Sequence, residues 1–270
     1  MHADVRLPAV AGRFYPRDPQ TLLADVQSYL ASPGFPVSAI ACVVPHAGYI
    51  YSGSVAGAVF SRLDLPQRCI LMCPNHTGRG RPLAIMSSGA WKTPLGPVTI
   101  DSPLATELIQ RFPLLEEDGE AHRSEHAAEV ELPFLQAKRP DISFVPIALG
   151  TGRYEVLEAL GVAIAEVLQV QEDRVLIIAS SDMNHYENDH ITRIKDHKAI
   201  APILALDGQG LFDVVMKEEI SMCGFGPTVA MLTAAKILGA THAELVKYAT
   251  SGEVSGDLDM VVGYAGVIVW

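Results

Sequence analysis

Histidine residues stand directly behind three apolar segments of the sequence, where each segment gives way to polar residues. The segments and their histidines are Ile40–Val44 with His46, Cys69–Cys73 with His76, and Arg174–Ala179 with His185. Apolar runs without polar alternation are typical of strands that are covered on both faces. Ligands of open α/β sheets bind outside the carboxyl ends of the strands. We therefore expect the three histidines to converge on one pocket, although any one of them alone could simply bond a backbone carbonyl.

Such a pocket would have the composition of a metal site. Neutral imidazoles are the commonest metal ligands, and two histidines with one anionic ligand are typical of non-haem iron and catalytic zinc. The residues that could supply the anionic ligand are Asp182, Glu129 and Cys223. Cys223 precedes a predicted helix that starts at Pro227, and a thiol near a helix N-terminus is expected to have a lowered pKa. A buried cysteine in a tight turn is the alternative interpretation.

A competing metal motif, H-x-x-E-H, runs from His122 to His126 and matches one class of zinc peptidases. That chemistry requires both histidines on one face of a helix. Ser124 has the features of an N-cap for a helix that extends to Lys138, so His122 is expected to lie outside this helix. On the same predicted helix, His126 and Glu129 are three residues apart and could face the pocket together.

The elements that must position these residues alternate between strands and helices. The predicted strands are Ile40–Val44, Cys69–Cys73, Ile142–Leu149, Arg174–Ala179 and Met260–Trp270. The predicted helices are Pro19–Leu30, Gly53–Leu63, Pro103–Arg111, Ser124–Lys138, Tyr154–Leu168, Thr192–Leu206 and Pro227–Leu238. This alternation is typical of an α/β fold with a parallel or mixed central sheet flanked by helices. Because Pro and Gly are not clustered, we predict one three-layer domain over residues 1–270.

The composition describes an acidic, folded chain. Its 270 residues are 49% hydrophobic and 19% charged, which excludes intrinsic disorder. The 31 Asp and Glu residues outnumber the 20 Lys and Arg residues, so the net charge is −11. Nucleic acid and anionic membrane surfaces would repel such a chain, and neither is expected as a partner.

The cysteines and the apolar runs indicate where the protein works. The 4 cysteines do not make a disulfide framework, and a reducing compartment is the simplest assumption. Cys42, Cys69 and Cys73 lie in apolar segments and are predicted to be small buried side chains. No apolar run reaches the roughly 18–20 residues of a membrane span, and Met1–Arg17 lacks the apolar core of a secretory signal. We therefore expect a cytoplasmic protein.

A series of ordered motifs resembles the MEMO family, which is called system protein B in the AmmeMemoRadiSam set. The resemblance covers nearly the whole chain and rests on the segments Leu7–Pro16, Pro45–Gly53, Pro74–Gly78, Glu125–Gln136, Ser180–His185, Cys223–Pro227, Thr250–Asp257 and Val262–Gly266. The MEMO family is similar in fold to the class III, LigB-type extradiol dioxygenases. The resemblance therefore implies a LigB-dioxygenase-like fold for this chain.

The resemblance also implies a ligand set for the metal. His46 and His76 match the two metal histidines of the family. Cys223 matches the position at which MEMO proteins carry Cys and the dioxygenases carry Glu. One transition metal ion per chain is implied, with Fe(II) as the expected ion and Cu or Zn as alternatives. A thiolate is softer than a carboxylate and more easily oxidised, which puts ring-cleaving dioxygenase turnover in doubt.

Roles for the surrounding residues follow from the same resemblance. His185 matches the acid/base histidine of the dioxygenases, and Asp182 matches its neighbour. His126 matches a pocket histidine on the substrate side. Tyr49 and Glu129 are expected to line the pocket beside it.

Three functions from different classes remain open at this point. The leading hypothesis is a non-haem-iron redox protein or oxygenase-like enzyme. The second is a catalytically inactive dioxygenase-like scaffold that binds a peptide or a partner protein through the old pocket, and the third is a zinc hydrolase. The resemblance further implies a radical-SAM protein and an AMMECR1-like protein as partners, with a small molecule or a peptide as ligand.

Overall fold

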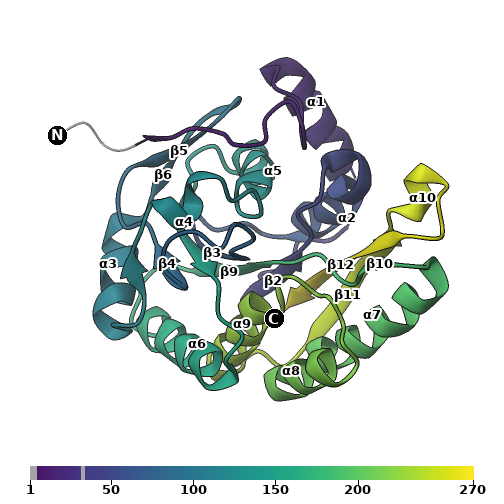
Figure 1. The fold of residues 1–270 in the computed structure, drawn as a ribbon. Helices are drawn as coiled ribbons and strands as arrows, with labels where there is room; N and C mark the ends of the chain where they lie inside the picture. Colours follow the sequence, from purple (N-terminus) through teal and green to yellow (C-terminus); the bar gives the residue numbers. More distant parts are fainter. Residues whose placement is uncertain (1–4, 32–33) are drawn as a thin grey trace.

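The computed structural model describes residues 5–31 and 34–270 and alternates strands with helices (Figure 1). The strands are β1 Val5–Arg6, β2 Ala41–Val44, β3 Arg68–Pro74, β4 Leu83–Ile85, β5 Ala90–Thr93, β6 Gly96–Ile100, β7 Glu116–Glu117, β8 Ser143–Leu149, β9 Val175–Ser180, β10 His185–Glu187, β11 Ala243–Thr250 and β12 Val261–Val269. The helices are α1 Pro19–Leu30, α2 Tyr49–Arg62, α3 Ser102–Arg111, α4 Glu120–Arg123, the 3-10 helix η1 Glu129–Glu131, α5 Leu132–Lys138, α6 Tyr154–Leu168, α7 Asp189–Leu204, α8 Gly208–Lys217, α9 Phe225–Ile237 and α10 Gly252–Ser255.

A mixed sheet forms the centre of the molecule. Its middle strands lie in the order β8-β3-β9-β2, and neighbouring strands in this group run parallel. β12 continues the sheet antiparallel to β2, and β11 pairs antiparallel with β12. The four parallel strands are almost entirely buried, which explains why they read as continuous apolar runs.

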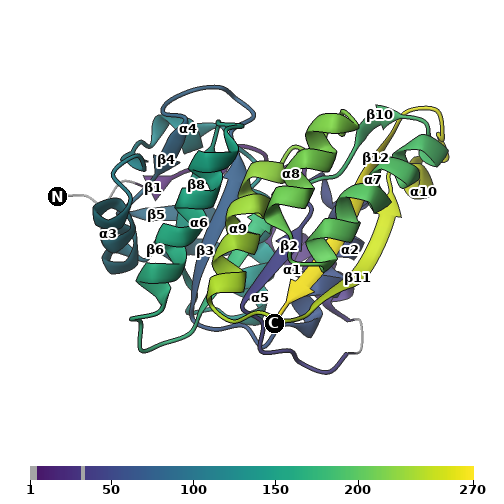
Figure 2. The same cartoon turned by 90° about the horizontal axis from the view of Figure 1, so that it is seen from below.

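Helices cover both faces of this sheet (Figure 1). Ile70 and Met72 of β3 pack into one apolar core with α3, α6, α7, α8 and α9, and Figure 2 shows α6, α9, α8 and α7 side by side across that face. Cys69, Leu71 and Cys73 pack into a second core with α1, α2 and α5. The alternation of strand side chains thus feeds two cores, and the predicted three-layer α/β fold is confirmed.

Several predicted boundaries agree with the structure. α1 spans the predicted residues, and the Asp18 carboxylate caps it by accepting the backbone N–H of Thr21 at 2.9 Å. α2 begins at Tyr49, ahead of the predicted Gly53. The short strands β4–β7 were not predicted, because strands of so few residues show no clear hydrophobic periodicity. β11 was not predicted, because most of its side chains are partly exposed and its sequence is not an apolar run.

The predicted helix Ser124–Lys138 is wrong. α4 ends at Arg123, Ser124 follows as its C-cap, and helical structure resumes only at η1 and α5. The Glu125 carboxylate accepts the backbone N–H of Ala127 at 3.0 Å, a local bond that competes with helix formation. Pro133 lies in the first turn of α5, where its missing N–H costs nothing, whereas it would have broken the longer helix.

Helix length bears on the question of a membrane span. The longest helix, α7, has 16 residues and includes charged side chains. Across residues 5–31 and 34–270, no helix is both long enough and apolar enough to cross a membrane.

Candidate metal centre

Three neighbouring strands deliver the predicted site residues to one edge of the sheet. β2 is followed by His46, β3 by His76, and β9 by Asp182. β3, β9 and β2 lie side by side and run parallel, so their carboxyl ends share that edge. Cys223 comes to the same place from the turn before α9. The expected convergence is therefore observed for His46 and His76.

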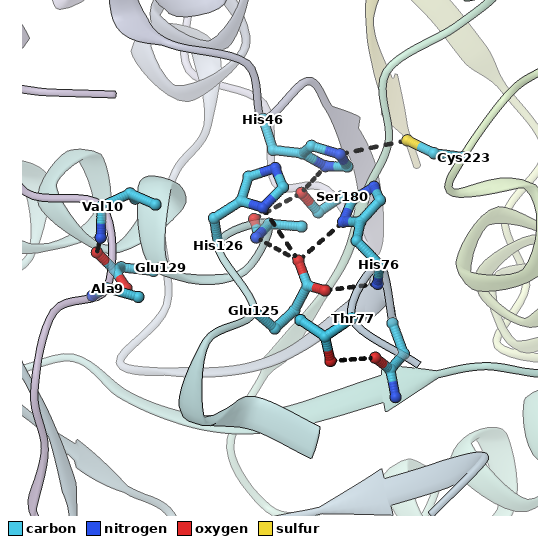
Figure 3. Close-up of polar contacts among 12 residues, drawn as sticks. Ala9, Val10, His46, His76, Thr77, Glu125, His126, Glu129, Ser180 and Cys223 are labelled. Carbon is cyan, nitrogen blue, oxygen red and sulfur yellow. Dashed lines mark hydrogen bonds and ion pairs between the residues drawn. The ribbon is translucent and has the colours of Figure 1, made fainter. Parts of the chain in front are cut away.

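His46, His76 and Cys223 form a group of potential metal ligands (Figure 3). Their ligand atoms all lie within 4.8 Å of one another. Cys223 Sγ is 3.2 Å from His46 Nε2, and the two imidazole centroids are 5.2 Å apart with their planes at 78°. Two imidazole nitrogens and one sulfur suit zinc, copper or iron. The residues therefore fit a transition metal ion.

His46 is held by residues at the end of β9. Its Nδ1 lies 2.8 Å from Ser180 Oγ, and its backbone N–H donates to Asp182 Oδ1 at 2.8 Å. The side chain is buried, and burial together with the neighbouring histidines lowers the pKa of His46 well below its usual value. A neutral imidazole whose Nδ1 is engaged presents Nε2 as the ligand atom.

His76 is held by Glu125, the glutamate of the H-x-x-E-H motif. Glu125 Oε2 accepts the backbone N–H of His76 at 2.6 Å, and Oε1 lies 2.8 Å from His76 Nδ1. Burial acts to lower the pKa of His76, but the hydrogen bond and charge of Glu125 outweigh it and raise this pKa overall. Burial acts to raise the pKa of Glu125, and the bond and charge of His76 bring it below its usual value. A carboxylate commonly orients a metal-binding histidine in this way.

Cys223 differs from expectation in its acid–base state. α9 starts at Phe225 with Gly224 as its N-cap, so the thiol lies outside the first turn. The backbone N–H of Asp182 donates to Sγ at 3.3 Å. Burial, together with the Asp182 carboxylate, nevertheless raises the pKa of Cys223. The predicted lowering is wrong, because burial and the Asp182 charge outweigh the hydrogen bonds from the Asp182 backbone and from Ser181. A metal would have to displace the thiol proton.

His185 and Asp182 lie beside the three potential ligands. The backbone N–H of His185 donates to Ser221 Oγ at 2.7 Å, and its Nδ1 donates to the Ser221 carbonyl at 2.8 Å. Burial lowers the pKa of His185, and burial raises the pKa of Asp182 to about 7. Among the described residues, His185 belongs to neither group of clustered ligand atoms. This placement is compatible with the acid/base role that the family resemblance implies.

Of the predicted pocket residues, His126 lies next to the potential ligands and Tyr49 does not. The His126 ring stacks on His76 with centroids 4.7 Å apart and an interplanar angle of 18°. Burial lowers the pKa of His126 to about 4. Tyr49 is buried in the core, where its hydroxyl donates to the Val130 carbonyl at 2.7 Å.

Glu129 serves the N-terminal segment. Its Oε2 accepts from Arg6 at 2.6 Å and from the backbone N–H of Ala9 at 2.7 Å. Its Oε1 accepts from the Tyr15 hydroxyl at 2.6 Å and from the N–H of Val10 at 3.0 Å. Figure 3 shows this carboxylate apart from the histidines. The expectation that a helix turns Glu129 and His126 toward one pocket is wrong, because the segment from 124 to 128 is not helical.

The zinc-peptidase alternative receives no support from the position of His122. This histidine is fully buried in α4, where its ring packs edge-on against Trp91 at 5.5 Å. Neither of its ring nitrogens has a hydrogen-bond partner among the residues described. His126, the other histidine of the motif, instead shares a second group of clustered ligand atoms with His76 and Glu125.

Comparison with known proteins places this architecture in a family. Residues 6–268 match the family model described as Memo-like protein. A MEMO1 family protein of Methanosarcina barkeri is 43% identical over 269 residues, which cover 98% of this chain and 100% of the relative. A MEMO1 family protein of Pyrobaculum aerophilum is 42% identical over 278 residues, which cover 98% of this chain and 99% of the relative.

A more distant likeness comes from a solved structure. The crystal structure of an uncharacterized protein from Escherichia coli K12 has a TM-score of 0.48 and 16% identity to this chain, covering 83% of it and 98% of that protein.

A MEMO1 family protein of Methanopyrus kandleri is 41% identical over 277 residues, covering 97% of this chain and 98% of that relative. The family match and the full-length archaeal relatives agree, and the chain belongs to the MEMO family.

Proposed function

We propose that this chain binds one divalent transition metal ion through His46, His76 and Cys223 and uses it in redox chemistry on a small molecule. The observation that carries the proposal is the approach of these three ligand atoms to within 4.8 Å of one another. The hydrogen bonds to Nδ1 of both histidines support it, because they leave the two Nε2 atoms for the metal. When bound, an iron ion would supply one-electron chemistry, and Fe(II) is the ion that we propose.

The surrounding residues are suited to moving protons. Nδ1 of His185 is engaged by the Ser221 carbonyl, so Nε2 is its basic nitrogen. The lowered pKa of His185 keeps the ring neutral near pH 7, in the form that accepts a proton. Asp182, whose pKa is about 7, can hold or release a proton near neutrality. We assign proton transfer to His185. Asp182 positions His46 by accepting its backbone N–H.

The test of the metal site is a titration with Co(II), whose thiolate bond gives a charge-transfer absorption. Wild type should show this absorption with one ion per chain, and Cys223→Ala should lose it along with tight binding. Cys73→Ala is the matched control, because Cys73 is equally a free thiol but is buried in β3. An unchanged absorption in Cys223→Ala, or its loss in Cys73→Ala, would contradict the proposed ligand set.

The redox proposal is tested separately. Protein purified anaerobically should contain iron, and O₂ consumption should be sought with a panel of small aromatic compounds. For any substrate found, His185→Gln should retain the metal and lose roughly 10²–10⁴-fold in turnover. Zinc in place of iron, with hydrolysis and no O₂ uptake, would favour the hydrolase instead.

A further inference from the structure

Glu131 has had no role assigned to it so far, and it is buried behind His46. It lies in η1 and is fully buried. Its Oε1 is 3.0 Å from Ser180 Oγ, while its Oε2 has no hydrogen-bond partner among the described residues. A buried carboxylate with one bare oxygen would be very costly, so its protonation state needs an explanation.

The hydrogen bonds around Ser180 supply that explanation. Ser180 Oγ lies 2.8 Å from His46 Nδ1, 2.9 Å from the Ala127 carbonyl and 3.0 Å from Glu131 Oε1. A hydroxyl has one hydrogen to donate and two lone pairs that accept. The Ala127 carbonyl can only accept, so it takes the hydrogen of Ser180. His46 and Glu131 must then both be donors if all three contacts are hydrogen bonds.

From this count we propose that Glu131 is kept as an uncharged carboxylic acid that donates to Ser180 Oγ, and that Ser180, whose hydrogen goes to the Ala127 carbonyl, holds His46 as a donor at Nδ1. The metal then meets Nε2 of His46 as the lone-pair nitrogen, so this step rests on the proposed metal centre. Ser180 is therefore the positioning residue for His46, and Glu131 completes the hydrogen bonds of Ser180.

The charge environment favours the same state. Burial, together with the nearby Asp182 carboxylate, raises the pKa of Glu131 well above its usual value. The one hydrogen bond of the acid goes to Ser180 Oγ, which accepts it, and no cationic side chain is hydrogen-bonded or ion-paired to Glu131 within the described ranges. The two histidines thus differ in support: an ionised Glu125 backs His76, and a neutral chain of hydroxyl and acid backs His46.

The protonation state can be measured on metal-free protein by infrared difference spectroscopy. Wild type minus Glu131→Gln should show the carbonyl band of a protonated carboxylic acid. Wild type minus Glu125→Gln should show carboxylate bands instead, which makes it the matched control. A carboxylate signature in the Glu131 difference spectrum, or no acid carbonyl band, would overturn the proposal.

The positioning role has its own readout in the ¹⁵N shifts of the His46 ring. Wild type and Glu131→Gln should both show a protonated Nδ1, since the Gln amide also donates to Ser180 Oγ. Ser180→Ala should lose this preference and weaken metal binding by roughly 10–100-fold, and Ser180→Thr should restore both. An unchanged Nδ1 signal in Ser180→Ala would overturn the positioning role. Because both spectra use metal-free protein, failure to bind metal would refute the proposed function without touching this result.

Discussion

At the scale of single residues, the site is defined as much by what holds the histidines as by the histidines themselves. Glu125 binds His76 through both its backbone N–H and its ring, at 2.6 and 2.8 Å. The carboxylate is fully buried, so its charge acts in a medium that screens it poorly. His76 is therefore expected to be the more electron-rich of the two potential imidazole ligands.

Glu125→Gln should weaken metal binding by roughly 10–100-fold, because an amide neither orients His76 as firmly nor raises its basicity. The measurement is a competition titration with a chelator of known affinity. Glu120→Gln, an exposed change in the neighbouring helix α4, should bind as wild type does. Equal affinities for the two variants would mean that Glu125 does not support the metal.

At the scale of elements, the approach of α9 to the end of β9 brings Cys223 into the site. A Cβ on Gly224 would stand 2.4 Å from the Ser180 carbonyl oxygen and 2.4 Å from Ser181 Cβ. Both obstacles are backbone or near-backbone atoms, so they cannot swing aside. Only a glycine lets the turn before α9 press against β9 this closely.

Gly224→Ala should push this turn away from β9 and carry Cys223 with it. We expect a loss of about 1–3 kcal/mol in the free energy of unfolding, measured with urea. Metal affinity should also fall at least tenfold. Gly119→Ala is the control, since a Cβ there meets nothing within 4 Å and its φ is −75°. Wild-type metal binding by folded Gly224→Ala would show that the close approach does not set the position of Cys223.

At the scale of the whole molecule, a buried carboxylate in α7 ties separate elements together beneath the site. Asp196 accepts the backbone N–H of Asn184 at 2.8 Å and the hydroxyl of Tyr248 in β11 at 2.6 Å. Asn184 in turn accepts from the backbone N–H and the hydroxyl of Ser221, at 3.1 Å each. The segments that carry His185 and Cys223 are thus joined through the core rather than at the surface.

Burial raises the pKa of Asp196 from 3.8 to about 6, which makes stability depend on pH. Between these values the folded state keeps a proton that the unfolded state releases, so stability falls as pH rises. The loss is at most about 3 kcal/mol, at 1.36 kcal/mol per pKa unit. Asp196→Asn lacks this titration. In urea unfolding, its free energy of unfolding should therefore rise relative to that of wild type from about pH 4 to about pH 7. If the difference in stability between Asp196→Asn and wild type does not change with pH, the raised pKa of Asp196 is refuted. Asp213→Asn, a change at an exposed position, is the control.

Sequence alone was sufficient for the fold and for the outline of the site. Uninterrupted apolar runs identified the strands β2, β3 and β9, because strands covered on both faces need no polar side chains. Their parallel arrangement follows from the intervening helices and brings their carboxyl ends to one edge, where His46 and His76 meet. These inferences depend only on local pattern and connection rules, so they can be made from residue order.

Protonation states and supporting contacts were decided only by the tertiary structure. The thiol of Cys223 has a raised pKa because of burial and the charge of Asp182, which is distant in sequence. Glu129 faces Arg6 and the N-terminal segment, whereas Glu125 faces His76, although both lie in the same acidic stretch. Helix periodicity could not separate these glutamates, because the segment folds around its long-range partners instead of its own backbone. The chemistry of a carboxyl or a thiol depends on burial and neighbours, and only packing brings those together.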